Sequence, residues 1–307
     1  MQIIKTALTL EDLPAPPSGK TGWPWTEQSQ LLPERMPDGS EWPRITLVTP
    51  SYNQGQFIEE TIRSVLLQGY SNLEYIVIDG GSTDNSVDII KKYTPWLSYW
   101  ISEKDSGQSE AINKGFVRTT GQIMGWLNSD DLLVSCALSK LASVYKPGLH
   151  WWNGNALHML SDKSLRTYSR PKGSITRNDL LHARLIIPQV STFWTYELWN
   201  KVGASLSLLN MAMDYELWLR FSEHSPAIVL EESLGIYKTH DDAKTGTEDG
   251  IVAYFTECNL IRLNEYQRRH QGRLLRFILI TFWTRAFLAK HYDGWRSWIG
   301  RRQIPYI

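Results

Sequence analysis

The chain has 307 residues, its 32 Lys and Arg balance its 32 Asp and Glu, and 42% of its residues are hydrophobic. The balanced charge argues against a nucleic-acid partner, while the hydrophobic content is sufficient for a substantial core in one large domain or two small ones. The two cysteines, Cys136 and Cys258, are far apart and lack CxxC spacing, which excludes a disulfide framework and a thiolate metal site.

The first 43 residues, here called the N-terminal arm, are rich in proline and lack sustained hydrophobic periodicity, so they are predicted to be extended. Gly19-Lys20-Thr21 resembles the end of a phosphate-binding P-loop, but the first glycine of that motif would fall at Pro14, which rejects it. Three tryptophans are expected to pin the arm onto the next domain or, alternatively, to bind an acceptor: Trp23, Trp25 and Trp42.

Strand and helix patterns alternate from residue 45 to residue 127. Short apolar runs predict strands, and apolar residues at helical spacing predict helices between them. The predicted strands are 45–49, 73–79, 97–102 and 122–127, and the predicted helices are 58–68, 87–94 and 108–117. This alternation predicts an α/β fold with a mostly parallel sheet and helices on both faces.

Polar clusters follow each predicted strand. They are Tyr52-Asn53, Asp79, Asp105 and Asp130-Asp131. Ligands bind at the carboxyl ends of parallel strands, so these clusters are expected to converge on one cleft. The first loop reads TPSYNQG rather than GxGxxG, which excludes a dinucleotide site and leaves a metal ion to hold phosphates.

The segment GQIMGWLNSDD, residues 121–131, ends in two adjacent carboxylates. Asp130 and Asp131 would repel each other at a strand end unless a cation lay beside them, and hard oxygen ligands suit Mg²⁺ or Mn²⁺ shared with substrate phosphates. The alternative is a turn that caps a helix starting near Leu132.

Beyond residue 131 a helix is predicted at 133–145 and a strand or hairpin at 149–160. Trp151 and Trp152 are either core residues or a surface on which a sugar stacks. Asp214 begins another predicted helix, where it either caps the helix or accepts a proton. Glu216 is the second choice for the proton acceptor.

Four motifs together resemble the family 2 glycosyltransferases with the GT-A fold, in the branch with DGGSTD in place of DDGSTD. They are TPSYNQGQFIEETIRSVLLQ, EYIVIDGGSTDNS, EKDSGQSEAINKGF and GWLNSDD. The resemblance covers about residues 43–245. It implies metal-dependent transfer of a sugar, with inversion, from a nucleotide-sugar donor, most often a UDP-sugar, to an acceptor hydroxyl.

The resemblance also implies roles for individual residues. Asp131, with Asp130, would hold the metal, His240 would approach the metal or the diphosphate, and Asp214 in MDYELWLR would be the general base. His240 has the alternative of an ordinary loop residue. Gln189 is implied as a polar contact on the acceptor side. The residues implied to surround the nucleotide are Thr49, Pro50, Tyr52, Asp79, Asp105, Asn113, Lys114 and Asp130.

Two positions depart from the family pattern. Gly80 stands where many relatives have a second Asp, and Asn128 stands where the DxD pattern has its first Asp. The base and ribose contacts therefore follow from the resemblance less directly than the metal site does.

The resemblance and the composition together predict three parts. These are the N-terminal arm (1–43), a catalytic domain (44–245, divided into a nucleotide half 44–131 and an acceptor half 132–245) and a basic, aromatic, helical tail (246–307). In the tail an apolar stripe and an arginine face predict either peripheral contact with an anionic membrane through 270–302 or a helix packed on the domain.

The expected partners are a nucleotide-sugar donor and a saccharide or lipid-linked acceptor. The sequence shows no secretory signal and no apolar run of about 18 residues, so a cytoplasmic protein is expected, either free or peripheral at the inner face of the membrane. Two alternatives remain, a non-catalytic protein that binds sugar nucleotides or glycans and a nucleotidyltransferase. The latter would be expected to carry a Gly- and Arg/Lys-rich loop after its first strand.

Overall fold

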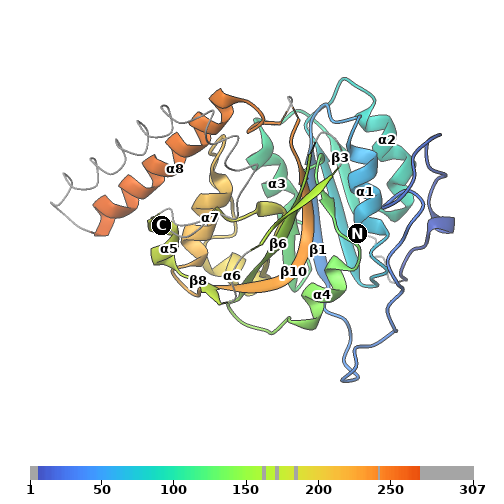
Figure 1. Cartoon of the computed structure of the whole chain (residues 1–307), viewed down its shortest axis with the longest axis horizontal. Coiled ribbons are helices and arrows are strands. Elements are labelled where there is room, and N and C mark those ends of the chain that lie inside the picture. Colours follow the sequence, from blue (N-terminus) through green and yellow to red (C-terminus); the bar gives the residue numbers. More distant parts are fainter. Residues whose placement is uncertain (1–5, 161–163, 170–172, 183–185, 241–242, 270–307) are drawn as a thin grey trace.

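The computed structural model describes residues 6–160, 164–169, 173–182, 186–240 and 243–269 (Figure 1). Its strands are β1 (Ile45–Ser51), β2 (Leu73–Asp79), β3 (Tyr99–Ser102), β4 (Ile123–Trp126), β5 (Leu132–Leu133), β6 (Trp151–Met159), β7 (Leu165–Tyr168), β8 (Ser174–Ile175), β9 (Thr192–Thr195) and β10 (Ala227–Lys238). The α-helices are α1 (Ile58–Leu66), α2 (Ser86–Tyr93), α3 (Gln108–Phe116), α4 (Ala137–Ser143), α5 (Arg177–Leu181), α6 (Tyr196–Lys201), α7 (Met213–Phe221) and α8 (Glu248–Arg269).

One mixed sheet organises these elements. Its main path runs β3-β2-β1-β4-β9-β6-β10-β5, with β7 and β8 paired beside β6 and β10. The first four strands in this order are parallel, and β9 and β5 are antiparallel to their neighbours. Every residue of β1 and β2 is buried, as expected for parallel strands covered on both faces. The predicted α/β fold with a mostly parallel sheet is confirmed.

Helices cover both faces of the sheet. One core packs α1, α2 and α4 against the sheet through residues such as Ile62, Ile90 and Leu138. The other packs α3, α6 and α7 through residues such as Ile112, Trp199 and Trp218. Stripes at helical spacing on these short helices provide the two apolar layers that the strands require.

The helix predicted at 133–145 is wrong in its first part. Leu132 and Leu133 form β5, which pairs with Ile236 and Gly235 of β10, and the helix begins only at Ala137. Backbone pairing with a distant strand therefore overrides the local helical pattern, which a reading of neighbouring residues does not detect.

The two ends of the described chain lie on opposite sides of the molecule (Figure 1). The N-terminal arm, described from residue 6, packs beside α1 with only a short 3-10 helix at Leu10–Asp12, whereas α8 packs beside α7. The predicted membrane contact through 270–302 lies outside the described residues. Within the described ranges, no helix has both the length and the hydrophobicity to cross a bilayer.

Candidate functional site

A cleft of about 760 Å³ opens at the carboxyl ends of β1 and β4. Its walls come from the loops after these strands, from the start of α7, from the end of β10 and from α8. The charged and polar side chains that line it include Tyr52, Lys104, Asp105, Asn128, Asp130, Asp131, Gln189, Asp214, Lys238, Lys244 and Tyr254. Its volume falls in the range typical of small-molecule sites.

The acidic turn, residues 128–131, forms one wall. Asp131 is buried, and its carboxylate accepts hydrogen bonds from Nδ2 of Asn128 at 3.1 Å and from the backbone N–H of Lys238 at 3.3 Å. The pKa of Asp131 lies well above its usual value, first because the carboxyl is buried and second because Asp130 is negatively charged beside it. The pair therefore concentrates negative charge at one edge of the cleft.

His240, in the segment after β10, lies behind this wall against Asp130. Its Nε2 lies 3.0 Å from Oδ2 of Asp130, and its ring packs on Phe57 with centroids 4.4 Å apart. Within the described chain, Nδ1 of His240 is buried without a hydrogen-bond partner. The structure thus brings three sequence-predicted residues, Asp130, Asp131 and His240, to one place.

These side chains fit a divalent cation that takes its other ligands from substrate and water. The carboxylates of Asp130 and Asp131 line the cleft, and the imidazole of His240, which has an unpartnered buried nitrogen among the described residues, lies next to Asp130. Among the described residues, no group of three or more His, Cys, Asp or Glu side chains is arranged to hold a metal ion by itself. That agrees with Mg²⁺-type sites, which use one or two carboxylates plus substrate phosphates.

Asp214 lies in the same cleft but comes from the start of α7. Its Oδ1 accepts the backbone N–H of Tyr215 at 2.7 Å, and burial raises the pKa of Asp214 to about 6. The N-cap residue of α7, Ala212, has no side-chain capping hydrogen bond. Instead Glu257 of α8 accepts the N–H groups of Met211 and Ala212, both at 2.8 Å.

The nucleotide side contains three of the predicted residues. Pro50, Tyr52 and Asp105 line the cleft, and the Tyr52 side chain is 60% exposed and open to a ligand. A Cβ added to Gly80 would lie 2.8 Å from Oδ2 of Asp105. The second Asp of the commoner family pattern therefore has no room here, because the Asp105 carboxylate occupies its place.

Gln189 also lines the cleft. Its Nε2 donates to the carbonyl of Trp126 at 2.8 Å, and its Oε1 is buried without a partner among the described residues.

Four predicted nucleotide residues do not line the cleft. Thr49 is buried, with Oγ1 at 3.0 Å from the Tyr75 hydroxyl, and Asp79 is buried, where its carboxylate accepts hydrogen bonds from Gly81, Ser82 and Ser102. These two side chains hold the strand ends together.

The other two lie on α3. The amide of Asn113 exchanges hydrogen bonds with the backbone of Leu206, and Lys114 pairs with Glu103 and Glu110, each at 3.0 Å. Both positions therefore serve local structure in this arrangement.

Trp151 and Trp152 lie in the core. Both are at most 1% exposed, and Trp151 stacks on Trp218 while Trp152 packs near Tyr145 on the opposite face. The structure therefore places both tryptophans in the core and not on a surface where a sugar could stack.

Several cleft residues were not among the predicted site residues, including Lys238, Lys244 and Tyr254, which lie at the end of β10 or beyond it. Lys238 and Lys244 bring positive charge to the cleft, and Nζ of Lys244 donates to the carbonyl of Asn210 at 3.0 Å. Tyr254 of α8 closes the side near Asp214. The alternation of β10 would have placed Lys238 on the same face as Ile236, but nothing local assigns that face to the cleft.

Comparisons with known proteins find similarity to glycosyltransferases. Residues 46–148 match the family described as Glycosyl transferase family 2. An uncharacterised glycosyltransferase of Rickettsia typhi is 27% identical over 267 residues, covering 80% of this chain and 78% of the relative. The putative teichuronic acid biosynthesis glycosyltransferase TuaG of Bacillus subtilis is 37% identical over 92 residues, covering 29% of this chain and 36% of TuaG.

Solved structures share the fold. TarS 1-349 of S. aureus in complex with UDP-GlcNAc superposes with a TM-score of 0.56 at 14% identity, covering 81% of this chain and 73% of that one. This chain spans 43% of the longer TarS chain. The mannosyltransferase PcManGT of Pyrobaculum calidifontis, in complex with GDP-Man and Mn²⁺, gives a TM-score of 0.53 at 16% identity, covering 83% of each chain.

Proposed function

Because the chain is a family 2 glycosyltransferase with a GT-A fold, we propose that it transfers a sugar, with inversion and with a divalent cation, from a UDP-sugar to an acceptor hydroxyl. One observation carries the proposal. Asp130 and Asp131 of the acidic turn and the carboxylate of Asp214 line the same cleft from elements that are distant in the chain, and His240 contacts Asp130. A leaving group and an attacking hydroxyl need such separate partners.

The donor binds with its nucleoside beside Pro50, Tyr52 and Asp105 and its diphosphate near the acidic turn. Tyr52 offers an exposed ring for stacking, and Asp105 offers a carboxylate that can accept from a base or ribose. The uridine assignment is supported by TarS, which was solved with UDP-GlcNAc, whereas PcManGT was solved with GDP-Man. Testing both donor types is therefore essential.

Asp130, Asp131 and His240 would hold Mg²⁺ or Mn²⁺. When bound, the cation neutralises charge that develops on the diphosphate leaving group without a proton transfer. The raised pKa of Asp131 reflects the unfavourable burial of its charge, which a positive neighbour offsets. Lys238 and Lys244 add further positive charge at the cleft.

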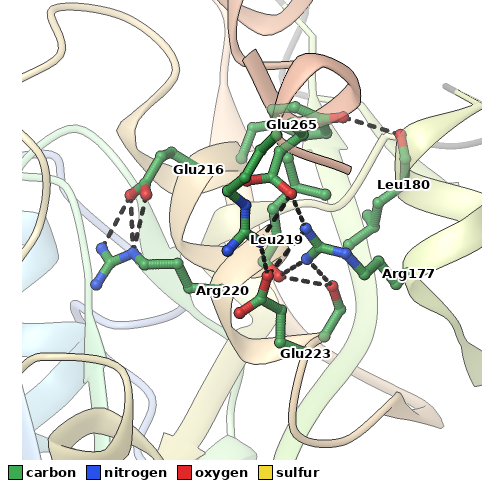
Figure 2. Close-up of polar contacts among 10 residues, drawn as sticks. Arg177, Leu180, Glu216, Leu219, Arg220, Glu223 and Glu265 are labelled. Carbon is green, nitrogen blue, oxygen red and sulfur yellow. Dashed lines mark hydrogen bonds and ion pairs between the residues drawn. The ribbon is translucent and has the colours of Figure 1, made fainter. Parts of the chain in front are cut away.

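Asp214 accepts the proton of the acceptor hydroxyl. A pKa of about 6 leaves this carboxyl mostly ionised at neutral pH and still a competent base. The second choice, Glu216, instead pairs with Arg220 four residues later, at 2.9 Å, and does not line the cleft (Figure 2).

The acceptor is a saccharide or lipid-linked glycan, and the protein acts in the cytoplasm in polysaccharide or glycoconjugate synthesis. The support is the partial match to TuaG, whose name assigns it to teichuronic acid biosynthesis. The family assignment removes the nucleotidyltransferase alternative. A non-catalytic binding protein would have no need for Asp214 beside the acidic turn.

The test is donor hydrolysis. The purified protein is incubated with Mn²⁺ and a panel of UDP-, GDP- and dTDP-sugars, and nucleotide release is measured. We expect release from a UDP-sugar, loss of release on adding EDTA, and no release by Asp131→Ala at an unchanged melting temperature. Undiminished nucleotide release in EDTA would contradict the proposed metal dependence. Release only from a GDP- or dTDP-sugar would contradict the proposed UDP-sugar donor.

A further inference from the structure

The N-terminal arm lies outside residues 46–148, the part that matches the family. We infer that the arm and the first turns of α1 are positioning elements that fix the acidic turn and the strand after it. The inference rests on the proposed function, because it assigns the arm a role in the geometry of the same metal site. Four sets of contacts carry it.

Helix α1 supports the segment after the acidic turn from one side. Two polar side chains of α1, three residues apart on one face, and Gln68, just after the helix, bond to backbone groups of the acidic turn and of this segment. Oγ1 of Thr61 lies 2.8 Å from the carbonyl oxygens of Ser129 and of Asp131. Further along, Oγ of Ser64 accepts the N–H of Leu133 at 3.2 Å, and Nε2 of Gln68 donates to the carbonyl of Val134 at 2.9 Å.

The N-terminal arm supports the same segment independently of α1. Nε1 of Trp23 donates to the carbonyl of Leu133 at 2.9 Å, and Oγ of the buried Ser29 accepts the N–H of Cys136 at 2.9 Å. The backbone N–H of Ser29 in turn donates to the carbonyl of Leu67, near the end of α1. The segment is therefore bonded to two elements at once.

A relay of side chains connects the arm to the Asp131 carboxylate itself. Nε1 of Trp25 donates to Oε1 of Glu60 at 3.3 Å, and Oε2 of Glu60 pairs with Nζ of Lys238 at 2.6 Å. The backbone N–H of Lys238 donates to Oδ1 of Asp131. Glu60 thus fixes the residue of β10 that orients the carboxylate.

Arg63 anchors the arm to the domain. This arginine of α1 is only 1% exposed, and its guanidinium donates to the backbone carbonyls of Pro14, Pro24 and Trp25. It also lies over the Trp25 ring, 5.4 Å from the centroid. A buried charge is tolerated only where its donors are satisfied, and here the arm satisfies them.

The experiment compares Trp25→Phe and Glu60→Gln with a matched control, Trp42→Phe. Trp42 is also a buried arm tryptophan with an indole hydrogen bond, at 2.8 Å to the carbonyl of Pro33, but it touches neither Glu60 nor the segment after the acidic turn. Two readouts are taken on the full chain. One is hydrogen exchange of the amides of residues 129–136 and 238, and the other is a titration with Mn²⁺ in the presence of UDP, followed by the electron paramagnetic resonance of free Mn²⁺.

For Glu60→Gln we expect faster exchange of these amides and Mn²⁺ binding weaker by on the order of 10-fold, as for other groups that orient metal ligands. Trp25→Phe should change both in the same direction by a smaller factor, and adding it to Glu60→Gln should have little further effect, since both act through Glu60. Trp42→Phe should leave both unchanged. Trp23→Phe, which removes the bond to Leu133, replaces Trp25→Phe if that variant does not fold.

Equal exchange in the control and the test variants would overturn the positioning role. So would weaker Mn²⁺ binding by Trp42→Phe and Trp25→Phe alike, because the effect would then be general loosening. If the parent protein does not bind Mn²⁺ with UDP, the proposed metal fails, while the exchange comparison still decides whether the arm fixes the turn.

Discussion

Two carboxyl groups of the cleft have raised pKa values for different reasons. Burial raises the pKa of Asp131, and the charge of Asp130 raises it further, so a cation beside the pair reverses much of the cost. Asp214 has a raised pKa of about 6 through burial alone, with no second carboxylate among the causes. The first environment suits a metal ligand, and the second suits a group that takes up a proton.

The first prediction concerns Asp214→Asn. Asparagine keeps the shape and can accept the N–H of Tyr215, but it cannot take a proton. We expect normal binding of the nucleotide-sugar and a loss of transfer on the order of 100-fold or more. In the parent, the transfer rate should rise as pH passes about 6 and level off above it, because the base acts when deprotonated.

Stability gives the matching control for that variant. The pKa of Asp214 is about 6 in the folded protein and about 3.9 in the unfolded chain, so folding favours the protonated carboxyl. Its contribution to the free energy of unfolding is therefore fully present below about pH 3.9 and is lost as the pH rises through about 6. The melting temperature of Asp214→Asn should therefore equal or exceed that of the parent at pH 8. Transfer within a few-fold of the parent would assign the base to another residue.

The motifs anticipated some side-chain positions and missed others. Asp105, Asp130, Asp131 and Asp214 follow strands or begin a helix, where the backbone itself aims them at the cleft. Asn113 lies further along α3, where its direction depends on a contact with Leu206, a residue 93 positions away. A local sequence pattern does not reveal such long-range contacts. The orientation of Asn113 and Lys114 relative to the cleft could therefore not be predicted from the sequence.

At the level of elements, α8 joins α5, the start of α7 and the segment just after α7. Arg177 of α5 pairs with Glu265 of α8 and with Glu223 (Figure 2). Arg268 pairs with the same two carboxylates. The same helix supplies Tyr254 to the cleft and Glu257 to the start of α7. It is therefore part of the site's framework.

The second prediction tests this connection with Glu257→Ala. The variant leaves the N–H groups of Met211 and Ala212 without their acceptor, which should cost about 1 kcal/mol in the free energy of unfolding. Asp214 lies two residues beyond Ala212, so kcat should also fall while KM for the donor changes little.

Urea unfolding and steady-state kinetics measure the two effects. Glu248→Ala removes an exposed carboxylate from the first turn of the same helix and should change the free energy of unfolding by less than about 0.5 kcal/mol. A loss of stability in Glu257→Ala with unchanged kcat would restrict Glu257 to anchoring α8.

At the scale of the molecule, the cleft is lined by residues from position 50 to position 254, so ligand binding should stabilise elements that are distant in the chain together. We expect UDP with Mn²⁺ to raise the melting temperature by on the order of 5 °C, because ligands near 100 times their Kd add about 2.7 kcal/mol to the free energy of unfolding. Either ligand alone should give a smaller shift, since diphosphate and cation share contacts. An identical shift with UDP in EDTA would contradict that coupling.

The alternating strands and helices up to residue 127 were predictable because each unit is local and the rules for parallel connections leave few topologies. The strand pairing beyond residue 127 was not predictable. Its strands β6, β9 and β10 pair out of chain order, and β10 spans the sheet beside both β6 and β5. The contacts of the acidic turn with Lys238 and His240 depend on that non-local pairing. The two carboxylates could therefore be predicted from the sequence, but the residues that surround them could not.

The dependence of the acidic turn on the arm also has a consequence for synthesis on the ribosome. The arm is translated first, yet Glu60 must wait for Lys238, 178 residues later, before the relay from Trp25 can close. Pairings of such wide sequence separation form late. The relay therefore stays open for most of translation, and the surroundings of Asp131 are completed only after β10 has emerged.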